Sequence, residues 1–143
     1  MPNKRIAIVG AGPAGLMAAE VLSAFDYEVH VFEQKPSAAR KFLMAGKKGL
    51  NISHVEPLEQ FVQRYDQVEW LSPWVKQWDA TWIQNWMQGL GIESYIGSSG
   101  RIFPNEMKAA PLLRAWLKRL AENGVLFHYR HQILDLKYQT LNI

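Results

Sequence analysis

The sequence predicts an α/β protein built on a parallel sheet, and three observations in its first third carry that prediction. Residues 5–9 (RIAIV) form a short β-branched run that ends at a glycine, which is typical of a buried strand. Residues 13–24 carry apolar residues at helical spacing, and residues 28–32 (EVHVF) again have the pattern of a strand. A strand, a helix and a strand in such close succession form a unit whose two strands pair in parallel through a right-handed crossover.

Composition agrees with an ordinary folded domain. The chain has 143 residues, of which 48% are hydrophobic and 20% charged, so about one domain with a sizeable core is expected. It contains no run of about 18 consecutive apolar residues, so we expect no membrane partner. The absence of cysteine excludes disulfides, iron–sulfur clusters and thiolate metal sites within these residues, and it fits a cytoplasmic location.

Four histidines are present, at no spacing typical of zinc ligands. His128 and His131 fall in a strand-like segment, where an odd separation predicts opposite faces. We therefore expect no metal site. His131 and Asp135 are expected to face solvent rather than to form an acid–base pair.

The formal charge is +3, with a basic bias around residues 35–48 and at residues 118–119. Such a bias suits any phosphate-bearing partner, including nucleic acid. Because no nucleic-acid-binding module is recognisable, we interpret most of these cations as solvated surface charge and expect no nucleic-acid partner.

Beyond residue 33 the pattern predicts a long basic loop (34–51), a short helix (56–65) and a second helical region. Ser72 and Pro73 predict the start of that region, as cap and first-turn residue, and it runs as one helix or two towards residue 88. The remaining elements are a hairpin from 93–96 and 101–103, an amphipathic helix over 108–122, and strands over 125–129 and 132–138.

The turn after the first strand has the sequence GAGPAG and carries the most specific signal. A GxGxxG pattern alone is weak, but here a strand precedes it and a helix, a second strand and an acidic residue follow it. Gly10 permits the tight turn, Gly12 lets the backbone approach a diphosphate, and Gly15 lets the helix pack closely. The helix N-terminus then offers free N–H groups to that diphosphate.

Glu33 ends the second strand, 18 residues beyond Gly15, where a carboxylate binds ribose hydroxyls. The same carboxylate repels a 2′-phosphate, so the pattern favours FAD or NAD over NADP. In a simple NAD domain a further helix and strand follow at once. Here the next core strand begins after Gly124, and an insertion of this size is the organisation of two-domain flavoproteins.

A second signal lies in residues 40–54 (RKFLMAGKKGLNISH), with Trp78-Asp79, GSSGRIFP at 97–104, Lys108-Ala109, Gly124-Val125 and Arg130-His131. These segments resemble, in order and spacing, the aminoacetone-oxidase-like (BaiN-like) FAD-binding flavoproteins. The resemblance covers nearly the whole chain. It implies a Rossmann-like FAD-binding domain of the glutathione-reductase type, with FAD as cofactor and a small-molecule substrate in the full-length protein.

The resemblance also implies residue roles. The diphosphate is expected near the loop, the ribose at Glu33 with Gln34 beside it, and adenine at the backbone of Ile133. Arg40 and Lys41 are expected near the diphosphate or the ribityl chain. Three residues are expected near the isoalloxazine, namely Gly46, Gly49 and Asn51. The full set of expected cofactor-binding residues is Gly10, Gly12, Pro13, Ala14, Gly15, Glu33, Gln34, Arg40, Lys41, Gly46, Gly49, Asn51 and Ile133.

The sequence departs from the family pattern in two respects. Lys47-Lys48 replaces a glycine-rich stretch that ends in Arg-Cys-Asn in many relatives, and the family's members are much longer. We therefore expect residues 1–143 to be the N-terminal portion of the domain, incomplete at the C-terminus. Residues 33–124 would contain the flavin-covering insertion and the substrate domain would be absent. Open strand edges would then favour a homodimer or a swapped assembly.

Catalytic residues are not identified by the sequence. Arg101 is a candidate for binding an anionic substrate or for a place near the flavin, although pairing with a local carboxylate in the hairpin is the favoured interpretation. The tryptophans that recur every four residues from Trp70 to Trp86 drift around a helix and cannot all face one ligand, and Pro73 suggests that Trp70 precedes the helix. The function predicted is FAD binding within a flavin-dependent oxidoreductase, the fragment alone being inactive. An NAD-binding or non-catalytic dinucleotide module is the alternative.

Overall fold

The computed structural model describes residues 4–45, 49–135 and 137. They divide into two compact units, which are treated separately below. The first unit contains Met1–Lys41 and Leu120–Ile143, and the second contains Phe42–Arg119. The second unit falls within the insertion expected from the sequence.

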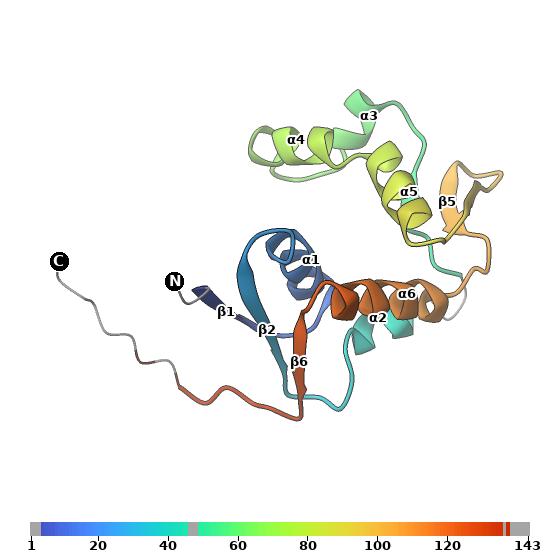
Figure 1. The fold of residues 1–143 in the computed structure, drawn as a ribbon. Helices are drawn as coiled ribbons and strands as arrows, with labels where there is room; N and C mark the ends of the chain where they lie inside the picture. The colour runs from blue at the N-terminus through green and yellow to red at the C-terminus, as the bar shows by residue number, and fades with distance from the viewer. Residues whose placement is uncertain (1–3, 46–48, 136, 138–143) are drawn as a thin grey trace. The chain divides into compact units, whose positions relative to one another are not determined.

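The first unit is a parallel sheet with the strand order β1-β2-β6 (Figure 1). Strand β1 spans Lys4–Val9, β2 spans Tyr27–Glu33 and β6 spans Leu126–Tyr129. Helix α1 (Pro13–Leu22) connects β1 to β2 and packs against both strands. This arrangement confirms the predicted α/β class and the predicted strand–helix–strand unit.

The core of this unit lies between α1 and one face of the sheet. Leu16 and Ala19 of α1 are fully buried, as are Val29 and Val31 of β2. Because side chains alternate along a strand, His30 and Phe32 lie on the opposite face. That face is more open, and Val9 of β1 is 60% exposed on it. The sheet therefore has one face packed against α1 and an opposite face that carries the rings of His30 and Phe32.

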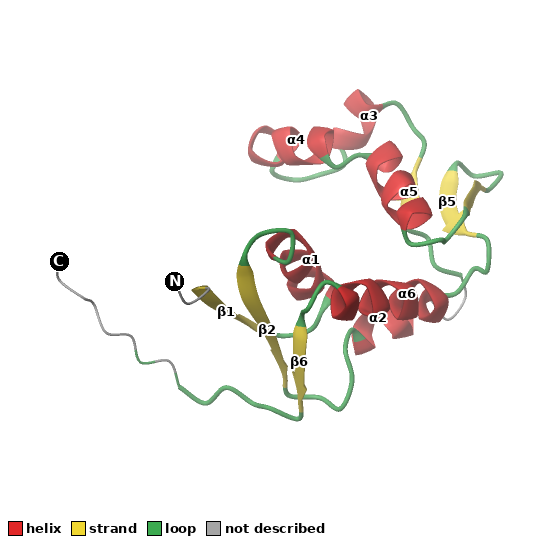
Figure 2. Ribbon diagram, viewed as in Figure 1, coloured by secondary structure: helices red, strands yellow, loops and turns green. Residues whose placement is uncertain are grey.

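The second unit combines helices with a small antiparallel sheet of order β3-β5-β4 (Figure 2). Its core is a cluster around Leu50, Met87, Ile102 and Leu112. Its elements are β3 (Ser53–His54), α3 (Leu58–Val62), α4 (Val68–Gln77), α5 (Ala80–Gly89), β4 (Ser94–Ile96) and β5 (Arg101–Pro104). Two helices cross the boundary between the units, α2 (Arg40–Ala45) and α6 (Ala109–Glu122).

Two helical boundaries differ from the prediction. Helix α4 begins at Val68, so Pro73 lies inside it and Trp70 belongs to the helix. The missing N–H of Pro73 leaves the Glu69 carbonyl without its helical partner, and both residues are exposed. Helix α2 occupies part of the segment predicted as a long loop. The helical region ending near residue 88 is two helices, separated at Asp79, whose side chain caps α5.

The strand predicted over residues 132–138 is wrong for the part that the structure describes. Residues 131–135 form no regular structure. Arg130 adopts a φ of 60°, which turns the chain out of the extended conformation immediately after β6. A strand also requires a hydrogen-bonded neighbour, and within the described ranges none pairs with these residues. An apolar run alone does not supply that partner.

Among the described residues, no helix has the length and apolar character needed to cross a bilayer.

Candidate functional site

The turn between β1 and α1 brings the GAGPAG residues into one tight loop. Gly10 has a φ of +98° and its N–H donates to the carbonyl of Phe32 at 2.7 Å, which fixes the end of β1 beside the end of β2. Gly12 is the N-cap of α1, and the first intrahelical bond runs from the Leu16 N–H to its carbonyl at 2.9 Å. Pro13 occupies the first turn, where a missing N–H costs nothing.

The packing of the protein requires glycine at one position of this loop and not at another. A Cβ at Gly15 would lie 2.0 Å from the carbonyl oxygen of Gly10, so α1 can approach the loop only if residue 15 has no side chain. Gly12, by contrast, has a φ of −77°, and a Cβ there would meet no atom within 4 Å. Packing therefore requires glycine at position 15, whereas it would accept a side chain at position 12.

The N-terminus of α1 is left available for a ligand. No side chain caps it, and its first turn carries no acidic residue. The first N–H groups of a helix have no intrahelical partner, and together with the helix dipole they favour an anion. The free space at Gly12 lies at this same position.

Glu33 is held rigidly beside the loop by two backbone hydrogen bonds. Its Oε2 accepts from the Ala11 N–H at 2.9 Å, and its Oε1 accepts from the Lys35 N–H at 2.8 Å. Each carboxylate oxygen can accept two hydrogen bonds, so both retain a lone pair for a ligand hydroxyl. The carboxylate is thus oriented before any ligand binds.

A cavity of about 220 Å³ opens at the carboxyl ends of the three parallel strands. This is the position at which open α/β sheets bind ligands. Four residues predicted from the sequence line it: Gly10, Glu33, Gln34 and Ile133. Its other lining residues are Val9, Phe32, His131 and Gln132.

Arg40 and Lys41 follow a segment that is bonded to the loop. The N–H of Ala39 donates to the carbonyl of Ala11 at 2.8 Å, and Ala38 and Ala39 are buried. Arg40 and Lys41 are themselves exposed. The backbone immediately before these two cations is therefore hydrogen-bonded to Ala11 of the loop.

Residues 4–143 match the family model described as the HI0933-like protein Rossmann domain. The chain belongs to the HI0933-like family. This result confirms the resemblance to BaiN-like flavoproteins, and it makes the first unit part of a Rossmann-type dinucleotide-binding domain. A search of curated protein sequences finds no match.

Among solved structures, THI4 shares the fold of this HI0933-like chain. THI4 from Thermovibrio ammonificans superposes with a TM-score of 0.53 at 20% identity, covering 89% of this chain and 38% of that one. An oxidoreductase from Methanosarcina mazei gives 0.45 at 13% identity, covering 88% of this chain and 51% of that one. The chain therefore spans about half or less of the length of these two structures.

Four further predicted residues lie elsewhere. Gly49 and Asn51 belong to the second unit, where Gly49 has a φ of +122° and a Cβ would come within 2.8 Å of Met107 Cε. Arg101 is exposed on β5 of the same unit. Gly46 lies outside the described residues. The predicted residues that the structure brings together are therefore those of the first unit.

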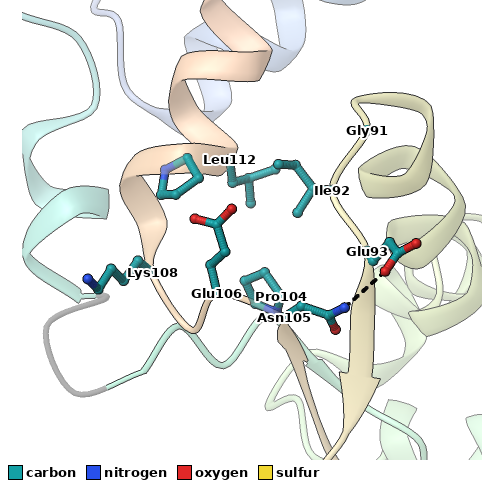
Figure 3. Close-up of a pocket in the computed structure, with 9 residues that line it drawn as sticks. Gly91, Ile92, Glu93, Pro104, Asn105, Glu106, Lys108 and Leu112 are labelled. Atoms are coloured by element: carbon teal, nitrogen blue, oxygen red, sulfur yellow. Dashed lines mark hydrogen bonds between the residues drawn. The ribbon is translucent and has the colours of Figure 1, made fainter.

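The second unit has a cavity of its own, of about 240 Å³ (Figure 3). Figure 3 shows the Glu106 carboxylate directed into it on the side of Leu112, away from Ile92. Glu93 is already engaged, because its Oε2 accepts from Asn105 Nδ2 at 3.1 Å. The described residues contain no cluster of three side chains able to hold a metal ion. This cavity therefore brings together none of the predicted cofactor-binding residues.

The prediction that His128 and His131 face apart is wrong. Their rings meet edge to face with centroids 5.8 Å apart. The strand ends at Tyr129 and the positive φ of Arg130 reverses the alternation, which returns His131 to the side of His128. Sequence reasoning consequently missed His131 as a cavity residue. The Arg130-His131 pair in the family resemblance was the signal that could have identified it.

Proposed function

We propose that this chain binds FAD through the first unit. In this proposal the diphosphate contacts the loop from Gly10 to Gly15 at the N-terminus of α1. The ribose hydroxyls donate to Glu33, with Gln34 beside them, and the adenine lies against the backbone of Ile133. FAD supplies hydride or electron transfer when bound, and the residues of this chain bind and orient it.

The observation that carries the proposal is the free space at Gly12. Its φ is accessible to any residue, and a Cβ would touch nothing in the protein. Glycine lowers stability relative to residues with a side chain, so its presence where packing does not require it calls for another reason. Close approach of a diphosphate to the backbone provides that reason.

The charges around the loop support the same ligand. The uncapped helix N-terminus attracts an anion, and Arg40 and Lys41 follow the segment that Ala39 bonds to the loop. Glu33 disfavours a 2′-phosphate, which FAD lacks. Pro13 and Ala14 complete the diphosphate contact in the proposal.

The rest of the proposal concerns the residues of the second unit. We assign Gly46, Gly49 and Asn51 to the neighbourhood of the isoalloxazine, as the family resemblance implies. Arg101 is the candidate for an anionic substrate of the longer protein, for which an oxidoreductase activity is proposed. No side chain is assigned as a catalytic acid, base or nucleophile.

The test is FAD retention by the purified chain, with two single glycine variants. The chain is incubated with FAD, unbound cofactor is removed by gel filtration, and the visible flavin bands are recorded. ADP affinity is measured in parallel by calorimetry. We expect Gly12→Ala to fold normally and to weaken ADP and FAD at least about tenfold, or about 1.4 kcal/mol.

Gly89→Ala is the matched control. Gly89 lies at the end of α5 in the second unit, and a Cβ there makes only ordinary contact with Arg119 Nη1 at 3.5 Å. This variant should bind like the wild type. Retention of NAD in place of FAD would favour the alternative of an NAD module. Wild-type protein that binds neither FAD nor ADP would overturn the proposal.

A further inference from the structure

His131 stands at the cavity of the first unit in a fixed orientation. Its backbone N–H donates to the carbonyl of Glu33 at 3.0 Å, which ties it to the end of β2. Its ring meets Phe32 edge to face with centroids 6.4 Å apart, and it meets His128 in the same way. The side chain is exposed and lines the cavity together with Glu33 and Ile133.

The hydrogen bond of the ring determines what its other nitrogen can do. His131 Nδ1 lies 2.8 Å from the carbonyl oxygen of Tyr129. A carbonyl only accepts hydrogen bonds, so Nδ1 carries the proton. In the neutral ring Nε2 is then an acceptor, and within the described part of the chain it has no hydrogen-bond partner. The ring therefore presents an acceptor that no protein group occupies.

The strand order predicts which part of a nucleotide this acceptor meets. Gly10 follows β1, Glu33 ends β2 and His131 follows β6, and the sheet order is β1-β2-β6. Neighbouring strands lie about 4.8 Å apart, so the cavity extends about 10 Å from the loop to His131. A diphosphate at β1 and a ribose at β2 leave the base at β6.

The cavity lining also limits the chemistry of that base. No Lys or Arg lines it, and the Glu33 carboxylate and His131 Nε2 both offer acceptors. The matching ligand presents hydrogen-bond donors. Among purine bases, adenine carries an exocyclic amine where hypoxanthine carries a carbonyl oxygen.

We infer that His131 is a specificity residue of this site, whose Nε2 accepts a hydrogen bond from the exocyclic amine of adenine. The inference rests on the proposed dinucleotide function and goes beyond it, since it assigns the choice of base to a side chain. The chain is then selective for adenine over hypoxanthine.

The experiment compares ADP with inosine diphosphate (IDP) by calorimetry, in the wild type and in two variants. His131→Phe keeps a ring against Phe32 and His128 and keeps the backbone bond to Glu33, but it has no acceptor. His131→Gln supplies an acceptor oxygen. We expect the wild type to bind ADP about tenfold more tightly than IDP, a difference that corresponds to one hydrogen bond. His131→Phe should lose this preference through weaker ADP binding, and His131→Gln should restore part of it.

The outcomes are distinct. If His131→Phe weakens ADP and IDP equally, or changes neither, the inference is overturned while the proposed FAD function stands. A wild type that binds ADP without preference over IDP likewise overturns it. If the wild type binds no nucleotide, the proposed function fails and this inference fails with it.

Discussion

The backbone N–H of Ala11 donates to Oε2 of Glu33 at 2.9 Å, across 22 residues of sequence. This bond joins the turn after β1 to the end of β2. It aligns the carboxylate before a ligand arrives, so that less orientational freedom is lost on binding. The GAGPAG loop and Glu33 are thus joined into one structural element.

Glu33→Gln tests that element. Glutamine has a single side-chain acceptor atom, so it cannot accept from both Ala11 and Lys35 as the carboxylate does. We expect a loss of about 1–2 kcal/mol in the free energy of unfolding, measured by urea denaturation followed by circular dichroism. Because repulsion of a 2′-phosphate also disappears, the preference for ADP over adenosine 2′,5′-bisphosphate should decrease about tenfold.

Glu106→Gln serves as the control for Glu33→Gln. It removes an exposed carboxylate in the second unit and should change neither quantity. An unchanged nucleotide preference in Glu33→Gln would contradict the ribose-binding role proposed for this residue.

Gly15→Ala should destabilise the chain where Gly12→Ala does not. The Cβ at residue 15 would lie 2.0 Å from a backbone carbonyl, which cannot move aside without displacing α1 from the loop. A cost of about 3 kcal/mol is expected for such overpacking. Thermal unfolding of the two variants side by side is the measurement, and equal melting temperatures would contradict the close approach of α1 to Gly10.

Tyr129 provides a pH-dependent signal from the first unit. Burial raises the pKa of its phenol, and the nearby Glu33 carboxylate raises the pKa further. A raised pKa in the folded state means that the stability contributed by this group is present below the ordinary value of about 10 and is lost as the pH rises above it. Alkaline titration of tyrosinate absorbance should therefore show one late-ionising tyrosine.

The late phase should vanish in Tyr129→Phe. It should move towards lower pH in Glu33→Gln, although not fully, since burial remains the larger cause. A late phase that survives Tyr129→Phe would show that another tyrosine is responsible.

Asp79→Ala should weaken the second unit. Asp79 is the N-cap of α5, and its Oδ1 accepts from the Trp82 N–H at 2.8 Å. Loss of such a cap costs about 1 kcal/mol, whereas Asp79→Asn keeps an acceptor and should cost less. All six tryptophans lie in the second unit, so tryptophan fluorescence during denaturation reports on it directly. Equal losses in both variants would argue against the cap.

The sequence was sufficient to predict elements whose signals are local. The strands over residues 5–9 and 28–32, the turn at Gly10 and the hairpin around residues 97–100 follow from periodicity and glycine placement, and the structure confirms them. The predicted strand over 132–138 depended on a pairing partner, which a local pattern does not contain. Similarly, alternation places His128 correctly on its strand, but it fails for His131 because the strand has already ended.

For the candidate site, residue types and spacing predicted the loop and Glu33. They also assigned close helix packing to Gly15 rather than to Gly12, and the structure adds the size of that constraint, a Cβ at residue 15 lying 2.0 Å from the Gly10 carbonyl oxygen. The orientation of the His131 ring had no sequence signal, since it depends on a bond to the carbonyl of Tyr129.

On the open face of the first unit, His30 Nδ1 lies 2.9 Å from His128 Nε2, and His30 Nε2 lies 2.8 Å from a carboxylate oxygen of Glu28. Only one hydrogen fits between the two ring nitrogens. A carboxylate accepts, so His30 Nε2 donates to Glu28, Nδ1 of the neutral His30 ring accepts, and His128 Nε2 donates to it. A carboxylate on β2 therefore selects, through one ring, which nitrogen carries the hydrogen in a second ring on the neighbouring strand β6.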